Sequence, residues 1–387
     1  MVKKNKICII TGSRADYGLL YWLMKNLDSD PEFELQVMVT GMHLSPEFGM
    51  TVRAVEEDGF QITARIETLM SSDTGIGVAK SLGIGIIGFA DAFQSFRPDA
   101  IILLGDRFEI FAAAQAALFT AIPVVHIGGG DITEGAYDDP MRHAISKLSH
   151  MHFVTNGDAY LRLLRMGEDP KRVFNFGSPG LDYLDQTKII EKNVLEEKLS
   201  FEFQKINFLI TFHPVTLDKV SSLDQLNELL EALDSYGNDA GLIFTFPNAD
   251  NQGRKIKSRL EGFVKSKKNA KLYSSLGINQ YLSAMKYVNA VVGNSSSGLY
   301  EAPSLRTPTV NIGIRQKGRI KAKSVFDCDA KKNEIIKSIN QAISFGNQKV
   351  INPYHVGNFA SLAVGELKKI KDFSCLGVKK FNDSLDL

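Results

Sequence analysis

Short apolar runs alternate along the whole chain with longer amphipathic stretches, and this alternation restricts the fold more than any other feature. In the first half, the strand-like runs are residues 7–11, 35–40, 100–104, 122–127 and 153–155. In the second half, they are residues 208–211, 242–246, 290–292 and 309–312. Strands that alternate with helix-length segments are typical of parallel sheets. The run 101–104 contains no polar residue, which predicts a strand covered by helices on both faces.

The chain of 387 residues is long enough for two domains of ordinary size. Polar and charged residues predominate between about 185 and 205, and the strand–helix rhythm restarts after them. We therefore predict an α/β protein with two Rossmann-like, doubly wound domains, residues 1–190 and 205–358. Leucines at helical spacing predict a helix over 222–237. A last helix within 359–380 is expected to join the first domain.

Charge and cysteine content argue against several classes of function. Lys and Arg total 45 against 44 Asp and Glu, so the formal charge is +1 and no overall field attracts nucleic acid or an anionic membrane. The first apolar run is too short for a signal peptide, and no uninterrupted run reaches the roughly 18 residues of a membrane span. Cys8, Cys328 and Cys375 form no CxxC pair. They fit a reducing cytosol, so we expect a cytoplasmic protein without a disulfide framework.

In the first half, polar motifs follow the predicted strands, where open α/β sheets bind ligands. The turn 11–14 enters a helix whose amides, together with Arg14, suit a phosphate; an ordinary helix cap is the alternative. This turn is neither a GxGxxG nor a Walker A sequence. Asp106 and Arg107 follow the buried strand 100–104. Asp106 is therefore a candidate acid or base, with a salt bridge or helix cap as the alternative.

The segment 126–143 is the densest in polar residues. Its three consecutive glycines let the backbone approach a ligand closely. It also contains four carboxylates, Asp131, Glu134, Asp138 and Asp139. In a partly dry cleft, such crowding separates carboxyl pKa values, so that one group acts as an acid and another as a base. The alternative is a solvated loop that caps a helix beginning near Pro140.

Histidines in and after this segment raise the question of a metal site. The candidate ligands are His126, Asp131, His143, His150 and His152. They contain no HExxH sequence and no compact ligand set, so packed or capping histidines are favoured. We predict no metal site and no organic cofactor.

In the second half, three polar segments follow strands: 211–214, 246–248 and 293–301. The serine run in the last segment offers hydroxyls and successive amides to a diphosphate, and Glu301 on the next helix can accept both ribose hydroxyls. A flexible turn is the alternative. The segment 315–319 adds local positive charge, for which a solvated loop is the alternative.

The motifs GSRADYG, GDRFE, TEGAYDDPMRHAISKLSH, FHP, GNSSSGLYEAP and NIGIRQKGR occur in this order between about residues 6 and 365. As a set they resemble the hydrolysing UDP-N-acetylglucosamine 2-epimerases of sialic-acid biosynthesis. The resemblance implies a glycosyltransferase-B architecture, with the active site in the cleft between the domains and the nucleotide held mainly by the second domain. It implies that UDP is eliminated to leave a 2-acetamidoglucal, which takes up water to give N-acetylmannosamine. It also implies a homo-oligomer, most simply a dimer.

By motif match, the resemblance gives binding roles to eight residues: the diphosphate to Arg14, His213, Ser295 and Ser296, the ribose to Glu301, and the rest of the nucleotide to Arg107, Asn248 and Arg315. Asp106 and Asp138 match acidic positions that the family uses in catalysis. One departure is Gly128, where many members carry Glu, so the third catalytic carboxylate is Glu134 or else Asp131. The altered pocket also suits a sugar with a 4-acetamido group and no 6-hydroxyl, as in the legionaminic-acid branch.

Three other functions remain open. A non-hydrolysing 2-epimerase would return UDP-N-acetylmannosamine, and analysis of the product would separate it from a hydrolysing enzyme. A glycosyltransferase has the same architecture, but a crowded acidic loop suits proton abstraction better than acceptor binding. An inactive sugar-nucleotide-binding subunit would bind UDP and turn over no sugar.

Overall fold

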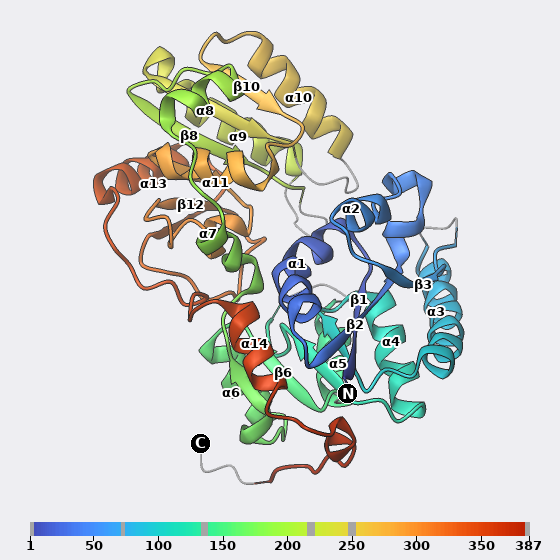
Figure 1. Cartoon of the computed structure of the whole chain (residues 1–387). Coiled ribbons are helices and arrows are strands. Elements are labelled where there is room, and N and C mark those ends of the chain that lie inside the picture. Colours follow the sequence, from blue (N-terminus) through green and yellow to red (C-terminus); the bar gives the residue numbers. More distant parts are fainter. Residues whose placement is uncertain (1–3, 71–73, 133–137, 215–220, 247–252, 384–387) are drawn as a thin grey trace. The chain divides into compact units, whose positions relative to one another are not determined.

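The computed structural model describes residues 4–70, 74–132, 138–214, 221–246 and 253–383. The chain folds into two compact units (Figure 1). The first unit is Met1–Asp182 together with Val356–Leu387, and the second is Tyr183–His355. Each unit contains one parallel sheet, as the alternation of strands and helices predicts.

Within the described residues of the first unit, seven strands form a sheet in the order β3-β2-β1-β4-β5-β6-β7. In chain order these strands are β1 (Asn5–Thr11), β2 (Phe33–Thr40), β3 (Ile62–Ile66), β4 (Ala100–Leu104), β5 (Val124–Ile127), β6 (Met151–Val154) and β7 (Val173–Asn175). The strand order changes direction between β1 and β4, so the loops after these two strands separate at the carboxyl edge. Open α/β sheets bind ligands at such a switch point.

Alternate residues of β1 enter cores on opposite faces of this sheet: Ile7 and Ile9 lie in one, and Cys8 and Ile10 in the other. The helices over the first face are α1 (Arg14–Ser29), α2 (Val52–Glu57) and α14 (Phe359–Leu367), and those over the second are α3 (Gly75–Phe96), α4 (Phe108–Phe119) and α5 (Asp138–Leu148). Helix α6 (Gly157–Arg165) packs against β6 and β7. A strand with both faces covered needs few polar residues, which accounts for the apolar run of β4.

The C-terminal helix packs on the first unit, where α14 lies beside α1 (Figure 1). The Asp182 carboxylate accepts hydrogen bonds from the backbone amides of Phe359 at 2.6 Å and Ala360 at 2.8 Å, which satisfies the start of α14. The helix lies within the predicted range 359–380 and ends at Leu367. A 3-10 turn, η6 (Phe373–Leu376), follows, and the Asp372 side chain caps it.

Among the described residues, α3 alone is long and apolar enough to cross a membrane, judged by length and composition. Helices buried in the core of a domain share this length and composition. Here α3 packs against α4 and β3, and it places Phe89 and Phe93 in the second core.

Within the described residues of the second unit, six strands form a sheet in the order β10-β9-β8-β11-β12-β13. In chain order these strands are β8 (Ile206–Thr211), β9 (Ala240–Thr245), β10 (Ala270–Tyr273), β11 (Ala290–Gly293), β12 (Thr309–Ile312) and β13 (Val325–Cys328). Its helices are α8 (Lys192–Leu199), α9 (Ser222–Asp234), α10 (Gly253–Lys265), α11 (Gly277–Tyr287), α12 (Ser297–Tyr300) and α13 (Lys332–Phe345), and α7 (Asp182–Gln186) lies at the division of the units. The strand order changes direction between β8 and β11.

The second unit also has a core on each face of its sheet. Phe208 and Ile210 of β8 pack under α9, α10 and α13, whereas Leu209 packs with α8 and α11. The helix predicted over 222–237 is present as α9, and all four of its spaced leucines are buried. Helix α8 comes from the polar stretch between the predicted domains, and its Leu195 and Leu199 pack within the second unit. That stretch therefore contributes to a core and is not merely a connection.

Candidate functional site

Asp106 and Arg142 form an ion pair at the carboxyl edge of the first sheet. Asp106 lies in the loop after β4, and Nη2 of Arg142, on α5, donates a hydrogen bond to its Oδ2. The Arg142 side chain is only 7% exposed. Its Nη1 donates to the backbone oxygen of Asp131 at 2.9 Å and to Oδ1 of Asp139 at 3.2 Å. One guanidinium therefore connects the loops after β4 and β5 with the start of α5.

Asp138 lies in the first turn of α5. The sequence predicts that this helix begins near Pro140, and in the structure its bounds are Asp138–Leu148. A carboxylate is stabilised at such a helix N-terminus. Although Asp138 keeps exposed surface, partial loss of solvent raises its pKa, and the Asp106 carboxylate raises it further. Arg142 and Arg107 act in the opposite direction. Asp106 and Asp138 therefore occupy unlike environments close together, an arrangement that can separate acid and base roles.

Asp131 ends the glycine loop after β5, and residues that follow β6 hold its carboxylate. Thr155 Oγ1 lies 3.1 and 2.9 Å from the two carboxylate oxygens, and Asn156 Nδ2 donates to Oδ1 at 2.8 Å. In the loop itself, Gly128 and Gly130 have φ angles of 78° and 81°. L side chains rarely adopt this conformation, so a Glu at position 128 would be strained.

Arg107 contacts a fully buried carboxylate on α4. Its Nε donates to Glu109 Oε1 at 2.7 Å, and Glu109 is 0% exposed. Glu109 Oε2 has no hydrogen-bond partner in the part of the chain that the structure describes. Asp16, in the first turn of α1, belongs to the same group of charges: burial raises its pKa to about 6, and Arg107 lowers it. Neither of these two acidic residues was predicted from the sequence.

The turn after β1 is a helix cap, with an exposed arginine just beyond it. Ser13 is the N-cap of α1, and its Oγ accepts a hydrogen bond from the Asp16 amide at 3.3 Å. Arg14 is the first residue of α1 and is exposed. Because β1 and β4 are neighbours in the sheet, Arg14 and Asp106 follow adjacent strands.

In the second unit, Asn294 joins the loop after β8 to the loops after β11 and β12. Its Oδ1 accepts from the His213 amide at 2.7 Å, and its Nδ2 donates to the His213 carbonyl at 2.8 Å. Its own carbonyl accepts from Arg315 Nη1 at 3.0 Å and from Gln316 Nε2 at 2.9 Å. The structure thus brings His213 and Arg315 together beside the serine run, through a residue that was not predicted as part of the site.

The serine run forms a small cluster of hydroxyl groups. Ser297 Oγ donates to Ser295 Oγ at 3.0 Å, and the Tyr281 hydroxyl lies 2.6 Å from Ser297 Oγ. Ser296 is the N-cap residue of α12, and its side chain makes no capping hydrogen bond. Ser295 and Ser296 are half-buried. The predicted pair of serines is therefore part of a group that also includes Ser297 and Tyr281.

Glu301 and His213 both lose much of their hydration. Glu301 lies at the C-terminal end of α12, which is only four residues long, and not within a helix as predicted. Its Oε2 is buried without a hydrogen-bond partner among the described residues, and burial raises its pKa to about 7. Burial, assisted by Arg315, lowers the pKa of His213 to about 4, so this imidazole is neutral at pH 7. Both groups are suited to hydrogen bonding with a ligand.

Two predicted site residues, Glu134 and Asn248, lie outside the described residues. Across the described ranges, no group of three or more His, Cys, Asp or Glu residues is placed to hold a metal ion. The buried histidines have other contacts. His126 Nε2 lies 2.8 Å from the Gly105 carbonyl, and His152 Nε2 lies 3.0 Å from Glu168 Oε2.

Arg142 is the most informative residue that was not predicted from the sequence. A signal for it was present, because it stands four residues after Asp138 and three after Asp139. Acidic and basic residues at this spacing meet on one face of a helix. Its longer-range contact with Asp106 depends on the packing of α5 against α4 and β5 and has no local signal.

Two Rossmann-like units with polar loops after adjacent parallel strands define a glycosyltransferase-B-like fold. A solved structure of a putative UDP-N-acetylglucosamine 2-epimerase from Listeria monocytogenes matches the chain with a TM-score of 0.78 and 19% identity, covering 95% of this chain and 96% of that one. A UDP-N-acetylglucosamine 2-epimerase from Neisseria meningitidis, solved with UDP-GlcNAc bound, matches with a TM-score of 0.73 and 20% identity. The match covers 94% of this chain and 100% of that one.

The family described as UDP-N-acetylglucosamine 2-epimerase matches residues 25–368. The chain therefore belongs to the UDP-N-acetylglucosamine 2-epimerase family.

Three relatives are more similar to this chain in sequence than the two solved structures are. A GDP/UDP-N,N'-diacetylbacillosamine 2-epimerase (hydrolyzing) from Campylobacter jejuni is 42% identical, covering 85% of each chain. Polysialic acid biosynthesis protein P7 from Escherichia coli is 37% identical, covering 99% of this chain and 98% of that protein. A UDP-N,N'-diacetylbacillosamine 2-epimerase (hydrolyzing) from Legionella pneumophila is 34% identical, covering 95% and 96%.

Proposed function

We propose that this chain is a hydrolysing 2-epimerase acting on a nucleoside-diphosphate-linked 2,4-diacetamido-2,4,6-trideoxyglucose. The observation that carries the proposal is the identity of 42% and 34% to two relatives named for this sugar, N,N'-diacetylbacillosamine. One of these names includes both GDP and UDP. The nucleotide in the proposal is therefore UDP or GDP.

The proposed reaction needs groups of the kind found after β4 and at the start of α5. A carboxylate removes the weakly acidic proton at C2 while the C1–oxygen bond to the diphosphate breaks, leaving a glycal and a free nucleoside diphosphate. Water then adds its hydroxyl to C1 and a proton returns to C2 on the opposite face, which gives the free manno sugar. We assign the acid and base roles to Asp106 and Asp138, with Arg142 orienting Asp106. We assign Asp131, or else Glu134, as a third carboxylate.

We assign nucleotide binding mainly to the second unit. The buried Oε2 of Glu301 has no partner among the described residues, which supports an acceptor role toward ribose hydroxyls. The hydroxyls of Ser295 and Ser296, the neutral imidazole of His213 and the Arg315 guanidinium suit the diphosphate. Arg14, Arg107 and Asn248 complete the proposed set.

A second candidate substrate is UDP-N-acetylglucosamine, with N-acetylmannosamine for sialic-acid biosynthesis as the product. The 37% identity to a polysialic acid biosynthesis protein over 99% of the chain favours it. With either substrate, we propose a cytoplasmic homodimer that requires no cofactor.

NMR of the purified chain in heavy water tests substrate and reaction together. Three substrates are compared: the UDP- and GDP-linked 2,4-diacetamido sugars and UDP-N-acetylglucosamine. We expect free nucleotide and a C2-deuterated 2,4-diacetamido-trideoxymannose from the UDP- or GDP-linked 2,4-diacetamido sugar. Preferred turnover of UDP-N-acetylglucosamine would make this sugar nucleotide the substrate instead. Persistent UDP-sugar epimers would contradict hydrolysis, and nucleotide binding without turnover of any substrate would indicate an inactive binding subunit. The Asp106→Asn variant serves as the control for chemistry at this site.

A further inference from the structure

The segment after η6 docks on the first unit at several points. The Asn382 amide donates to the Gly167 carbonyl at 2.9 Å, and the Phe381 ring packs so closely on Gly167 that a Cβ there would lie 2.4 Å from it. Lys147 Nζ lies 4.9 Å from the centre of the same ring. Arg172 Nη1 donates to the carbonyl of Val378 at 3.4 Å. We call residues 377–382 the C-terminal strap.

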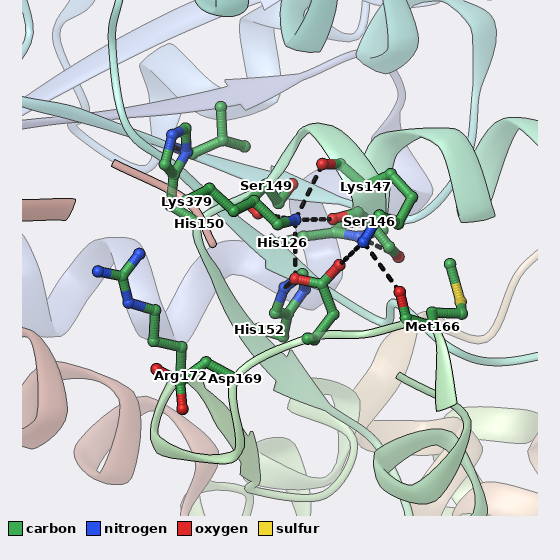
Figure 2. Close-up of polar contacts among 12 residues, drawn as sticks. His126, Ser146, Lys147, Ser149, His150, His152, Met166, Asp169, Arg172 and Lys379 are labelled. Carbon is green, nitrogen blue, oxygen red and sulfur yellow. Dashed lines mark hydrogen bonds and ion pairs between the residues drawn. The ribbon is translucent and has the colours of Figure 1, made fainter. Parts of the chain in front are cut away.

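Lys379, in the middle of this strap, caps the C-terminal end of α5 (Figure 2). Its Nζ donates to the carbonyls of Ser149 at 2.7 Å, Lys147 at 2.9 Å and Ser146 at 3.2 Å. Carbonyls at the end of a helix have no partner within the helix, and a cation there is stabilised by the helix dipole. One ammonium group therefore satisfies two carbonyls in the last turn of α5 and the carbonyl of Ser149 just after it.

A buried carboxylate holds Lys379 in this place. Glu168 Oε2 lies 2.7 Å from Lys379 Nζ, and the Glu168 side chain is 3% exposed. The same carboxylate contacts His152 Nε2 at 3.0 Å and Lys147 Nζ at 2.7 Å. Burial raises the pKa of Glu168, but His152 and the two lysines outweigh it and lower the pKa to about 2. Glu168 is therefore ionised at neutral pH and attracts Lys379 strongly.

Hydrogen bonds lead from the capped end of α5 toward the candidate active site. Ser146 Oγ lies 3.1 Å from His126 Nδ1, and His126 Nε2 lies 2.8 Å from the Gly105 carbonyl. Burial lowers the pKa of His126 to about 3, so the ring carries one proton. A carbonyl can only accept a hydrogen bond, so this proton is on Nε2. Gly105 directly precedes Asp106, and Asp106 pairs with Arg142 of α5.

We propose that Lys379 is a positioning residue, through which the C-terminal strap fixes α5 and thereby the geometry of the Asp106–Arg142 pair. The catalytic part of this inference rests on the proposed function, because it takes Asp106 as a reacting group. A displacement of about 1 Å at reacting groups lowers rates by about 100-fold. Loss of the Lys379 contacts is expected to move α5 by less than about 1 Å, because the rest of the helix stays packed. We therefore expect kcat to fall by about tenfold or more.

The test compares Lys379→Met with Lys379→Arg and with Lys380→Met, a matched control because Lys380 is the exposed neighbour. We expect Lys379→Met to lower kcat about tenfold or more, with the affinity for UDP or GDP within twofold of wild type. Lys379→Arg is expected to recover most of the rate, since a guanidinium can still donate to the carbonyls and to Glu168. Lys380→Met is expected to match wild type. Hydrogen exchange of residues 138–148 provides a readout besides activity, and Lys379→Met is expected to accelerate it.

Turnover of Lys379→Met within twofold of wild type would overturn the proposal. So would unchanged exchange in α5, or a rate loss that Arg does not recover. If Lys379→Met does not fold, Phe381→Ala loosens the same strap without removing a charge, and wild-type turnover and exchange in that variant would overturn the proposal. If the wild-type chain turns over no sugar nucleotide, the proposed function fails. The exchange data alone then decide whether the strap fixes α5.

Discussion

The Glu301→Gln substitution is expected to stabilise the unliganded protein and to weaken nucleotide binding. Burial raises the pKa of Glu301 from 4.5 to about 7. The folded state therefore holds a proton that the unfolded state releases, and the ionised carboxylate destabilises the folded state. This destabilisation is absent below pH 4.5, grows as the pH rises and is complete above pH 7. Glutamine has nearly the same shape and no charge, so it removes the destabilisation.

The size of the effect follows from the pKa. A difference of about 2.5 pH units at about 1.36 kcal/mol each gives an upper limit of about 3 kcal/mol. The residue keeps some contact with solvent, so we expect about half of this value at pH 8. At pH 5, by the same linkage, about a quarter of the effect remains. For a unit of this size, 1 kcal/mol moves Tm by about 2–4 °C.

The assay is differential scanning calorimetry of wild type and Glu301→Gln at pH 8 and pH 5, without ligand. We expect the Tm of the second unit to rise by about 3–6 °C at pH 8, and by much less at pH 5. Glu197→Gln is the matched control, because Glu197 is exposed in the same unit. Titration calorimetry with UDP or GDP is expected to show an affinity about tenfold to a hundredfold lower for Glu301→Gln, since a charged acceptor is lost. Equal stability at pH 8, or the same gain at both pH values, would refute the reasoning.

Three further outcomes are expected. Asp106→Asn and Asp138→Asn are each expected to lower turnover by about 10² to 10⁴ with nucleotide affinity retained, and near-normal rates in the NMR assay would exclude them as acid or base. Gly130→Ala is expected to destabilise the first unit, because its Cβ would lie 2.5 Å from the Ala159 carbonyl, and an unchanged Tm would contradict this. Leu229→Ala, at a fully buried position of α9, is expected to cost the second unit about 2–5 kcal/mol in urea unfolding, and a cost below about 1 kcal/mol would contradict the packing described.

The strands that the sequence predicts and those that it does not predict differ in their place in the sheet. All nine predicted runs coincide with strands, whereas β3, β7, β10 and β13 were not predicted. These four are the edge strands of the two sheets. An edge strand is less fully covered, so residues such as Arg65 in β3 and Asp327 in β13 interrupt its apolar pattern. Apolar runs therefore identify the central strands, on which the candidate site depends.

In the candidate site, too, the sequence predicts residues that have a local signal and misses residues that depend on distant contacts. Asp106, Arg14 and His213 could be selected because each lies within three residues of the end of a strand, and strand ends are readable from local pattern. Glu109 and Arg142 were missed because their importance lies in contacts across the fold, with Arg107 and with Asp106. Glu109 would pass for an ordinary first-turn helix residue in the sequence. Only its full burial beside Arg107 distinguishes it.

Gly128 connects the loop conformation to the proposed choice of sugar. Its positive φ disfavours a Glu at this position, so the third carboxylate of the proposed mechanism is assigned to another residue of the loop. Asp131 meets one requirement for that role, because Thr155 and Asn156 fix the orientation of its carboxylate. A Cβ at position 128 would meet no described atom within 4 Å. Apart from its chain neighbours, the described residues thus leave this space free, and under the proposed function a bulkier substituent of the sugar, such as a 4-acetamido group, would occupy it.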